Sequence, residues 1–157
     1  MHATQAAAAA VYTAMDHRQY STAAWSAHPL HPTHADGFSD VDLVNFVFTM
    51  DLLNFSFWSE LDAARRFQIE YRGQRWAGYN SLVAALRRAL EGGVPVTTPA
   101  FWASPRFDVE TAKLVFFSAT EEEIPLLMER FGMLKEVGVQ LHEVGAPPCV
   151  HRTGSGD

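Results

Sequence analysis

Apolar and polar residues follow each other along the chain in patterns that predict a mainly helical protein. The longest apolar stretch runs from Val41 to about Trp58, and Asp40 in front of it is a plausible N-cap. Apolar residues occupy nearly every side of this expected helix, which is typical of a helix buried inside a domain. An Ala-rich stretch over residues 5–16 predicts an earlier helix, and the prolines of segment 28–32 predict a loop between the two.

A strict alternation of apolar and polar residues follows. Phe67, Ile69 and Tyr71 alternate with Gln68 and Glu70, and Arg72-Gly73 separates them from a second short run, 75–77. This alternation predicts a β-hairpin.

After the hairpin, apolar residues at core spacing predict a helix from Asn80 or Ser81 until Gly92-Gly93 stops it. Its outer side is expected to carry Arg87 and Arg88.

The last part of the chain has helical periodicity again. After a proline-containing loop over 94–105, Asp108 can cap a short helix to about Phe117. Thr120 and Glu123 form a potential capping box for a longer helix to about Glu143. One apolar stripe marks that helix: Ile124, Leu127, Met128, Phe131, Leu134, Val137 and Leu141. No hydrophobic period continues past Gly145, so we expect one helical domain over 1–144 and a disordered tail over 145–157.

Composition narrows the functional classes. The 157 residues are 48% hydrophobic and carry a net charge of −6 without a Lys/Arg cluster, which disfavours a dedicated nucleic-acid binder and favours a small polar ligand. The single cysteine, Cys149, allows no internal disulfide and has no partners at metal-ligand spacing, which fits a cytoplasmic protein without a metal site. No apolar stretch reaches the roughly 20 residues of a membrane-spanning helix, and the tract 6–11 is a poor secretory signal.

Four residues of the apolar stretch 41–58 suggest a binding site. Asp51, Asn54, Phe55 and Trp58 are spaced i, i+3, i+4 and i+7, so a helix would place a carboxylate, an amide and two aromatic rings on one face. A purine-like base offers N–H donors to the carboxylate and amide and a π-face for stacking. In the alternative interpretation, the two polar side chains bond neighbouring backbone groups and the rings belong to the core.

Two further residues are weaker candidates. His28 could line a pocket or transfer a proton, although the nearby His31 and His34 also suggest a solvated histidine-rich loop. Tyr79, between hairpin and helix, could present its hydroxyl to a ligand, although a tyrosine at such a corner commonly packs and bonds backbone. Glu121, Glu122 and Glu123 are expected to serve the dipole of the following helix.

Several short segments resemble the queuosine salvage family, also called queuosine 5′-phosphate N-glycosylase/hydrolases. The resemblance covers about residues 20–143, and the least ordinary segment is Asn54-Phe55-Ser56-Phe57-Trp58. The similar segments are 25–30, 45–48, 51–60, 71–73, 78–79, 81–86, 88–90, 94–96 and 124–130.

This resemblance implies a mainly α fold with a small hairpin, similar to the helix-hairpin-helix DNA glycosylases. It also implies hydrolysis of queuosine 5′-monophosphate to queuine without metal or organic cofactor, in support of tRNA modification. By this resemblance, segment 51–58 corresponds to the base-binding part of the family's proteins, and His28 and Tyr79 are further pocket candidates. The substrate is a small molecule, so neither direct nucleic-acid binding nor a membrane is expected.

The chain also departs from the family pattern. Glycosidic cleavage requires a carboxylate beside an oxocarbenium-like sugar, and the family carries it in a later Phe-Ala-Asp-Tyr-Arg-type motif that has no match here. Asn80 stands where the family usually has Trp. We therefore expect an incomplete, N-terminal part of such an enzyme with no assigned catalytic residue. The alternative is a non-catalytic module that binds a deazapurine base.

Overall fold

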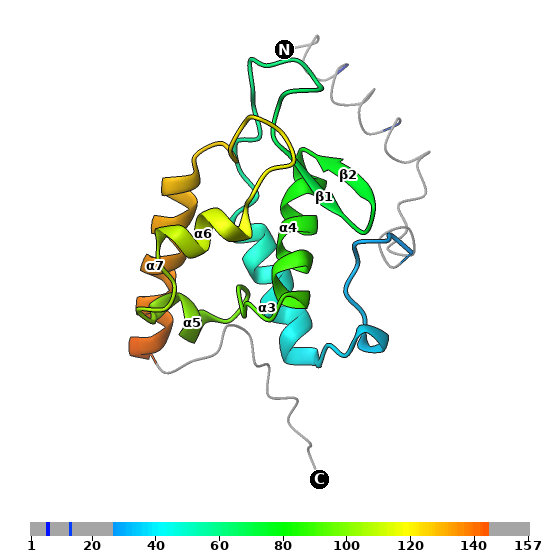
Figure 1. Ribbon diagram of the computed structural model, residues 1–157. Coiled ribbons are helices and arrows are strands. Elements are labelled where there is room, and N and C mark those ends of the chain that lie inside the picture. The colour runs from blue at the N-terminus through cyan, green and yellow to red at the C-terminus, as the bar shows by residue number, and fades with distance from the viewer. Residues whose placement is uncertain (1–5, 7–12, 14–26, 145–157) are drawn as a thin grey trace. The chain divides into compact units, whose positions relative to one another are not determined.

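The structure is a computed structural model that describes residues 6, 13 and 27–144 (Figure 1). The chain divides after His31 into two compact units, and the helices and strands from His34 onward belong to the second, which begins at Pro32. The expected helix over 5–16 lies almost wholly outside the described residues, and the expected disordered tail over 145–157 lies outside them entirely.

Helices dominate the second unit, and the strands pair only with each other, as the sequence predicts. The elements in chain order are the 3₁₀ turn η1 (His34–Asp36), α3 (Asp40–Leu52), β1 (Gln68–Tyr71), β2 (Gln74–Ala77), α4 (Tyr79–Glu91), α5 (Pro99–Ala103), α6 (Val109–Val115) and α7 (Leu127–Val144). The mainly α fold with a small hairpin is therefore confirmed. Similarity to the helix-hairpin-helix glycosylases remains a prediction.

The hairpin forms where the alternation predicts it. β1 and β2 are antiparallel with Tyr71 opposite Gln74, and the turn residues Arg72 and Gly73 both have positive φ, 52° and 73°. Two positive φ angles in a two-residue loop are typical of a type I′ turn, whose twist matches that of paired strands. The alternate residues of β1, Ile69 and Tyr71, are buried beside α4.

α3 is shorter and more open than expected. It begins with a capping box between Ser39 and Asp42 and ends at Leu52, six residues before the predicted end. Its buried residues are Phe46, Thr49 and Met50, whereas Val44 and Val47 on the other side are exposed. The expectation of a helix buried all round is therefore wrong for the described part of the chain.

α4 is the most buried helix of the described chain. Nearly all of its residues from Ser81 to Ala89 are shielded from solvent, and it packs on the hairpin, α3 and α6. The arginines expected on its outer side are not there. Arg87 is fully buried and bonds Asp36 and the hydroxyl of Tyr71, and Arg88 donates to the carbonyls of Val115 and Phe117.

The last helices pack closely together. α6 follows its Asp108 cap as predicted, but the loop 94–105 also contains α5, whose Phe101 and Trp102 are buried. α5 lies against α7 where Gly138 leaves room: a Cβ at that position would lie 2.8 Å from the Ala103 nitrogen.

α7 begins at Leu127, so the predicted capping box at Thr120 is wrong. The Thr120 hydroxyl instead donates to the carbonyl of Arg66. No helix within the described ranges is long and apolar enough to cross a membrane.

Candidate functional site

Asp51 and Tyr79 lie near each other at the carboxyl end of α3. Asp51 is in the last turn of α3 and is exposed, and the Tyr79 hydroxyl at the start of α4 donates to the sulfur of Met50. Burial raises the pKa of Tyr79, and the nearby negative charge of Asp51 raises it further. The carboxylate of Asp51 is therefore accessible, whereas the hydroxyl proton of Tyr79 is already donated to Met50.

The helical spacing proposed for the other candidates does not occur. α3 ends before Asn54, Phe55 and Trp58, which lie in an irregular segment, so the four candidates do not share a helix face. Asn54 stays close to Asp51 because its backbone N–H donates to the Asp51 carbonyl at 3.2 Å. Trp58 is 91% exposed and is not part of the core.

A buried arginine, Arg130 of α7, organises this irregular segment. Its guanidinium donates to the carbonyls of Leu53 and Phe55, and to that of Ser56 at 3.1 Å. The rings of Phe55 and Phe57 lie 4.4 and 4.8 Å from its central carbon. Phe55 is therefore occupied by a cation–π contact rather than free to stack on a ligand face.

The charge of Arg130 is balanced by dipoles and not by an acid. The described residues include no carboxylate in an ion pair with it, and burial lowers its pKa to about 10, so it remains cationic at neutral pH. Ser56 has a positive φ of 48°, an unfavourable conformation for a residue with a side chain. The bond from Arg130 to its carbonyl helps to hold that conformation.

Sequence reasoning missed Arg130 as an organising residue. It lies between Leu127 and Leu134 at helical spacing, on the side of α7 that faces the core. A charged residue inside an apolar stripe is a detectable signal. One of its acceptors, the carbonyl of Pro125, is nearby in the chain, but the three carbonyls of the irregular segment lie more than 70 positions earlier.

His28 belongs to the first unit. Its Nδ1 accepts the backbone N–H of Leu30 at 3.2 Å, and its carbonyl accepts that of His31 at 2.9 Å, so it forms a local turn. Its role in a binding site stays a prediction.

An apolar groove runs along the exposed side of α3 and ends at Asp51. Its volume is about 430 Å³, and apart from Asp51 its lining is wholly apolar: Leu43, Val44, Val47 and Phe48. Below the groove the Phe48 ring stacks on Trp102 of α5 at 6.3 Å. The groove therefore offers an apolar wall with one carboxylate at its end.

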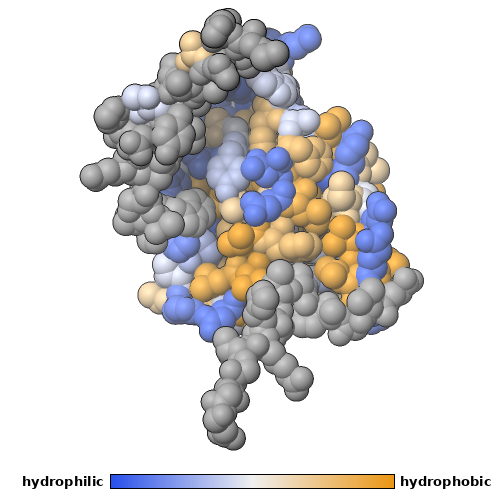
Figure 2. All heavy atoms as spheres, turned by 180° about the vertical axis from the view of Figure 1, so that it is seen from behind, coloured by the Kyte–Doolittle hydropathy of each residue, from blue (hydrophilic) through white to orange (hydrophobic). Residues whose placement is uncertain are grey.

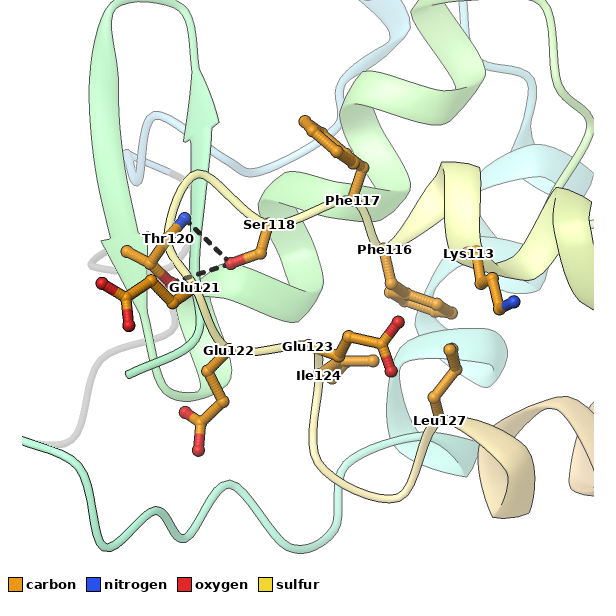
Figure 3. A pocket seen from close by; sticks show the side chains of 10 residues that line it. All are labelled: Lys113, Phe116, Phe117, Ser118, Thr120, Glu121, Glu122, Glu123, Ile124 and Leu127. Atoms are coloured by element: carbon orange, nitrogen blue, oxygen red, sulfur yellow. Dashed lines mark hydrogen bonds between the residues drawn. The ribbon is translucent and has the colours of Figure 1, made fainter. Parts of the chain in front are cut away.

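A second hollow, of about 340 Å³, lies between the end of α6 and the start of α7 (Figure 3). Its floor includes Phe116, Ile124 and Leu127, and its rim carries three consecutive glutamates, 121–123.

Two of these glutamates already have structural partners. Glu122 accepts the hydroxyl of Ser59 and the backbone N–H of Phe67, both at 2.6 Å, and Glu121 pairs with Arg65. The expected role at a helix dipole is therefore wrong, because this segment joins loops and precedes no helix directly.

No group of three or more potential metal-ligating side chains comes together within the part of the chain that the structure describes. The acidic residues near the helix ends have other roles. Asp42 and Asp108 cap α3 and α6, and Asp36 bonds Arg87 and Thr33, which lowers its pKa to about 2.

Comparison with known proteins connects this fold to one enzyme family. The family model described as queuosine salvage protein matches residues 30–147. A queuosine 5′-phosphate N-glycosylase/hydrolase of Schizosaccharomyces pombe is 43% identical over 123 residues, which are 74% of this chain and 34% of that protein. Proteins of the same name from Bos taurus and Sphaerobacter thermophilus are 39% and 45% identical, over 76% and 64% of this chain and 33% and 29% of theirs.

A mainly α unit with one hairpin and a family match over most of its length thus define the class of protein. The chain belongs to the queuosine salvage protein family. It spans about a third of the length of the curated relatives it matches.

Proposed function

We propose that this chain supplies part of the base-binding wall of an enzyme that hydrolyses the N-glycosidic bond of queuosine 5′-monophosphate and releases queuine. The observation that carries the proposal is the match to relatives named queuosine 5′-phosphate N-glycosylase/hydrolase at 34–45% identity. The released base would support tRNA modification, and the reaction would take place in the cytoplasm without a cofactor.

The accessible carboxylate of Asp51 supports a role in base recognition. A 7-deazaguanine base carries N–H donors, and a carboxylate accepts such donors in strong, charge-assisted hydrogen bonds. The Tyr79 hydroxyl oxygen, as an acceptor, and the Asn54 amide are candidates for further polar contacts, and His28 and Trp58 are further candidates. Phe55 would act indirectly, since its ring lies on Arg130.

The carboxylate that stabilises the sugar cation is a separate requirement of the reaction. Asp36, Asp42 and Asp108 are bound to other groups of the fold, and the sequence has no match to the motif expected to carry the catalytic aspartate. We therefore assign no catalytic residue and expect this chain alone to bind queuine without cleaving the nucleotide.

Calorimetric titration of the chain with queuine tests the base contact. We expect saturable binding that Asp51→Asn weakens about tenfold, the loss of one charge-assisted hydrogen bond. Asp40→Asn removes an exposed carboxylate from the other end of α3 and is the matched control, with no expected change. Absence of binding, or equal loss in both variants, would contradict the proposal.

Incubation with queuosine 5′-monophosphate separates binding from hydrolysis. Mass spectrometry should find no free queuine above the level of a protein-free control. Release of queuine by the chain alone would contradict the expected lack of turnover and would move the search for the catalytic carboxylate to the described residues.

The second candidate function is a non-catalytic module that captures a deazapurine base. The accessible carboxylate of Asp51 supports it, because capture of a base requires no carboxylate beside the sugar. In this case the chain should bind queuine equally well with and without the remaining part of a relative. The mixture should release no queuine from queuosine 5′-monophosphate.

A further inference from the structure

We propose that the exposed apolar side of α3 is an interface for the part of the family fold that lies outside the matched region. The interface consists of the groove residues Leu43, Val44, Val47 and Phe48, together with Val41 at the start of the helix. The inference rests on family membership and on this surface, and it does not depend on the proposed hydrolysis.

α3 has two apolar sides, and the described residues cover only one of them. Phe46, Met50 and the following Leu53 lie in the core, whereas Val41, Val44 and Val47 on the other side are 55%, 38% and 42% exposed. Figure 2 shows the back of the molecule, where hydrophobic side chains form a broad area. A helix that is apolar on all sides is typical of one buried on all sides, so the exposed side indicates a neighbour outside the described residues.

We assign this neighbour to the part of the relatives that lies outside the matched region. The matched residues are 29–40% of the relatives' lengths, so those proteins contain a much larger polypeptide beside this part of the fold. That polypeptide is the occupant to which the proposal commits. Because the groove ends at Asp51, a polypeptide docked on α3 would also border the candidate base site.

Co-expression tests the interface. The tagged chain is produced together with the part of the Schizosaccharomyces pombe relative that lies outside the 123 matched residues, and co-purification is quantified. We expect a complex in a one-to-one ratio. Hydrogen exchange of the α3 amides should slow in the complex, because docking covers this side of the helix.

Matched variants locate the surface. Val44→Lys should lower the recovered complex at least about tenfold, since docking would bury an unpaired charge. Val139→Lys is the control, because Val139 is 45% exposed on another helix, α7, and its variant should leave recovery unchanged. Val44→Thr keeps the shape of valine and should weaken binding less than Val44→Lys. Equal thermal unfolding of the isolated variants shows that each is folded.

Three results would overturn the proposal: no complex, equal loss with Val139→Lys, or a chain that dimerises by itself through α3 and loses dimerisation with Val44→Lys. The last result would assign the surface to a second copy. Turnover is read separately in the same mixture. A complex without queuine release would support the interface and contradict the proposed enzyme function. Release of queuine without a stable complex would support the enzyme function and contradict the interface.

Discussion

At the scale of single residues, Arg130 is the group on which the irregular segment 53–57 depends. Arg130→Met keeps the apolar length of the side chain but leaves the carbonyls of Leu53, Phe55 and Ser56 without their donor. Unsatisfied buried carbonyls are costly, so we expect the free energy of unfolding to fall by about 3 kcal/mol. Urea denaturation followed by circular dichroism measures this loss.

Arg65→Met is the matched control for that variant. Arg65 forms an exposed pair with Glu121, and exposed pairs contribute less than about 1 kcal/mol. Similar losses in the two variants would mean that the buried guanidinium does not hold the segment.

The pair of Asp51 and Tyr79 gives a second prediction at this scale. The charge of Asp51 raises the pKa of Tyr79 in addition to the larger effect of burial. Asp51→Asn should therefore lower that pKa, although burial keeps it above the ordinary value.

Ultraviolet titration of the phenolate band measures this pKa, with Tyr79→Phe to identify the transition. Asp40→Asn removes a distant carboxylate of the same helix and should leave the titration of Tyr79 unchanged. An unchanged pKa in Asp51→Asn would show that the two side chains do not interact.

At the scale of elements, two glycines of α7 have opposite expected effects when replaced by alanine. A Cβ at Gly138 would lie 2.8 Å from both the Ala103 nitrogen and the Trp102 Cβ, whereas one at Gly132 meets no atom within 4 Å. Gly138→Ala should therefore destabilise the fold by about 1–2 kcal/mol despite better helix propensity. Gly132→Ala should stabilise it by up to about 1 kcal/mol.

Thermal and urea unfolding of the two variants check the packing of α5 on α7. Stabilisation by both substitutions would show that the two helices are not in close contact at Gly138. Destabilisation by both would show that the exposed side of α7 at Gly132 has a neighbour.

At the scale of the whole molecule, the net charge predicts weak binding to nucleic acid. With −6 charges overall, the chain should bind labelled tRNA or single-stranded DNA more weakly than a Kd of about 100 µM at physiological salt. Fluorescence anisotropy at low and high salt is the measurement. Tight binding that weakens steeply with added salt would favour a glycosylase acting on nucleic-acid bases instead of a free nucleotide.

The sequence by itself predicted the elements that depend on short-range patterns. The alternation around Ile69 and the turn at Arg72-Gly73 predicted the hairpin, and Asp108 marked the start of α6. The family also followed from short segments, and the comparisons confirmed it. These features need only neighbours in the chain, because turn chemistry, capping and periodicity act over a few residues.

Tertiary structure decided where α3 ends and where α7 begins. A continuous apolar pattern gave no reason to end α3 at Leu52, but Arg130 binds the carbonyls that follow it. The capping box predicted at Thr120 does not form. The Thr120 hydroxyl donates to the carbonyl of Arg66 instead, and the carboxylate of Glu122 accepts the backbone N–H of Phe67. The candidate site changed for the same reason. Asp51 lies near Tyr79, a proximity that the sequence did not predict. The aromatic face expected from helical spacing does not form, because α3 ends at Leu52 and the following carbonyls bond to Arg130.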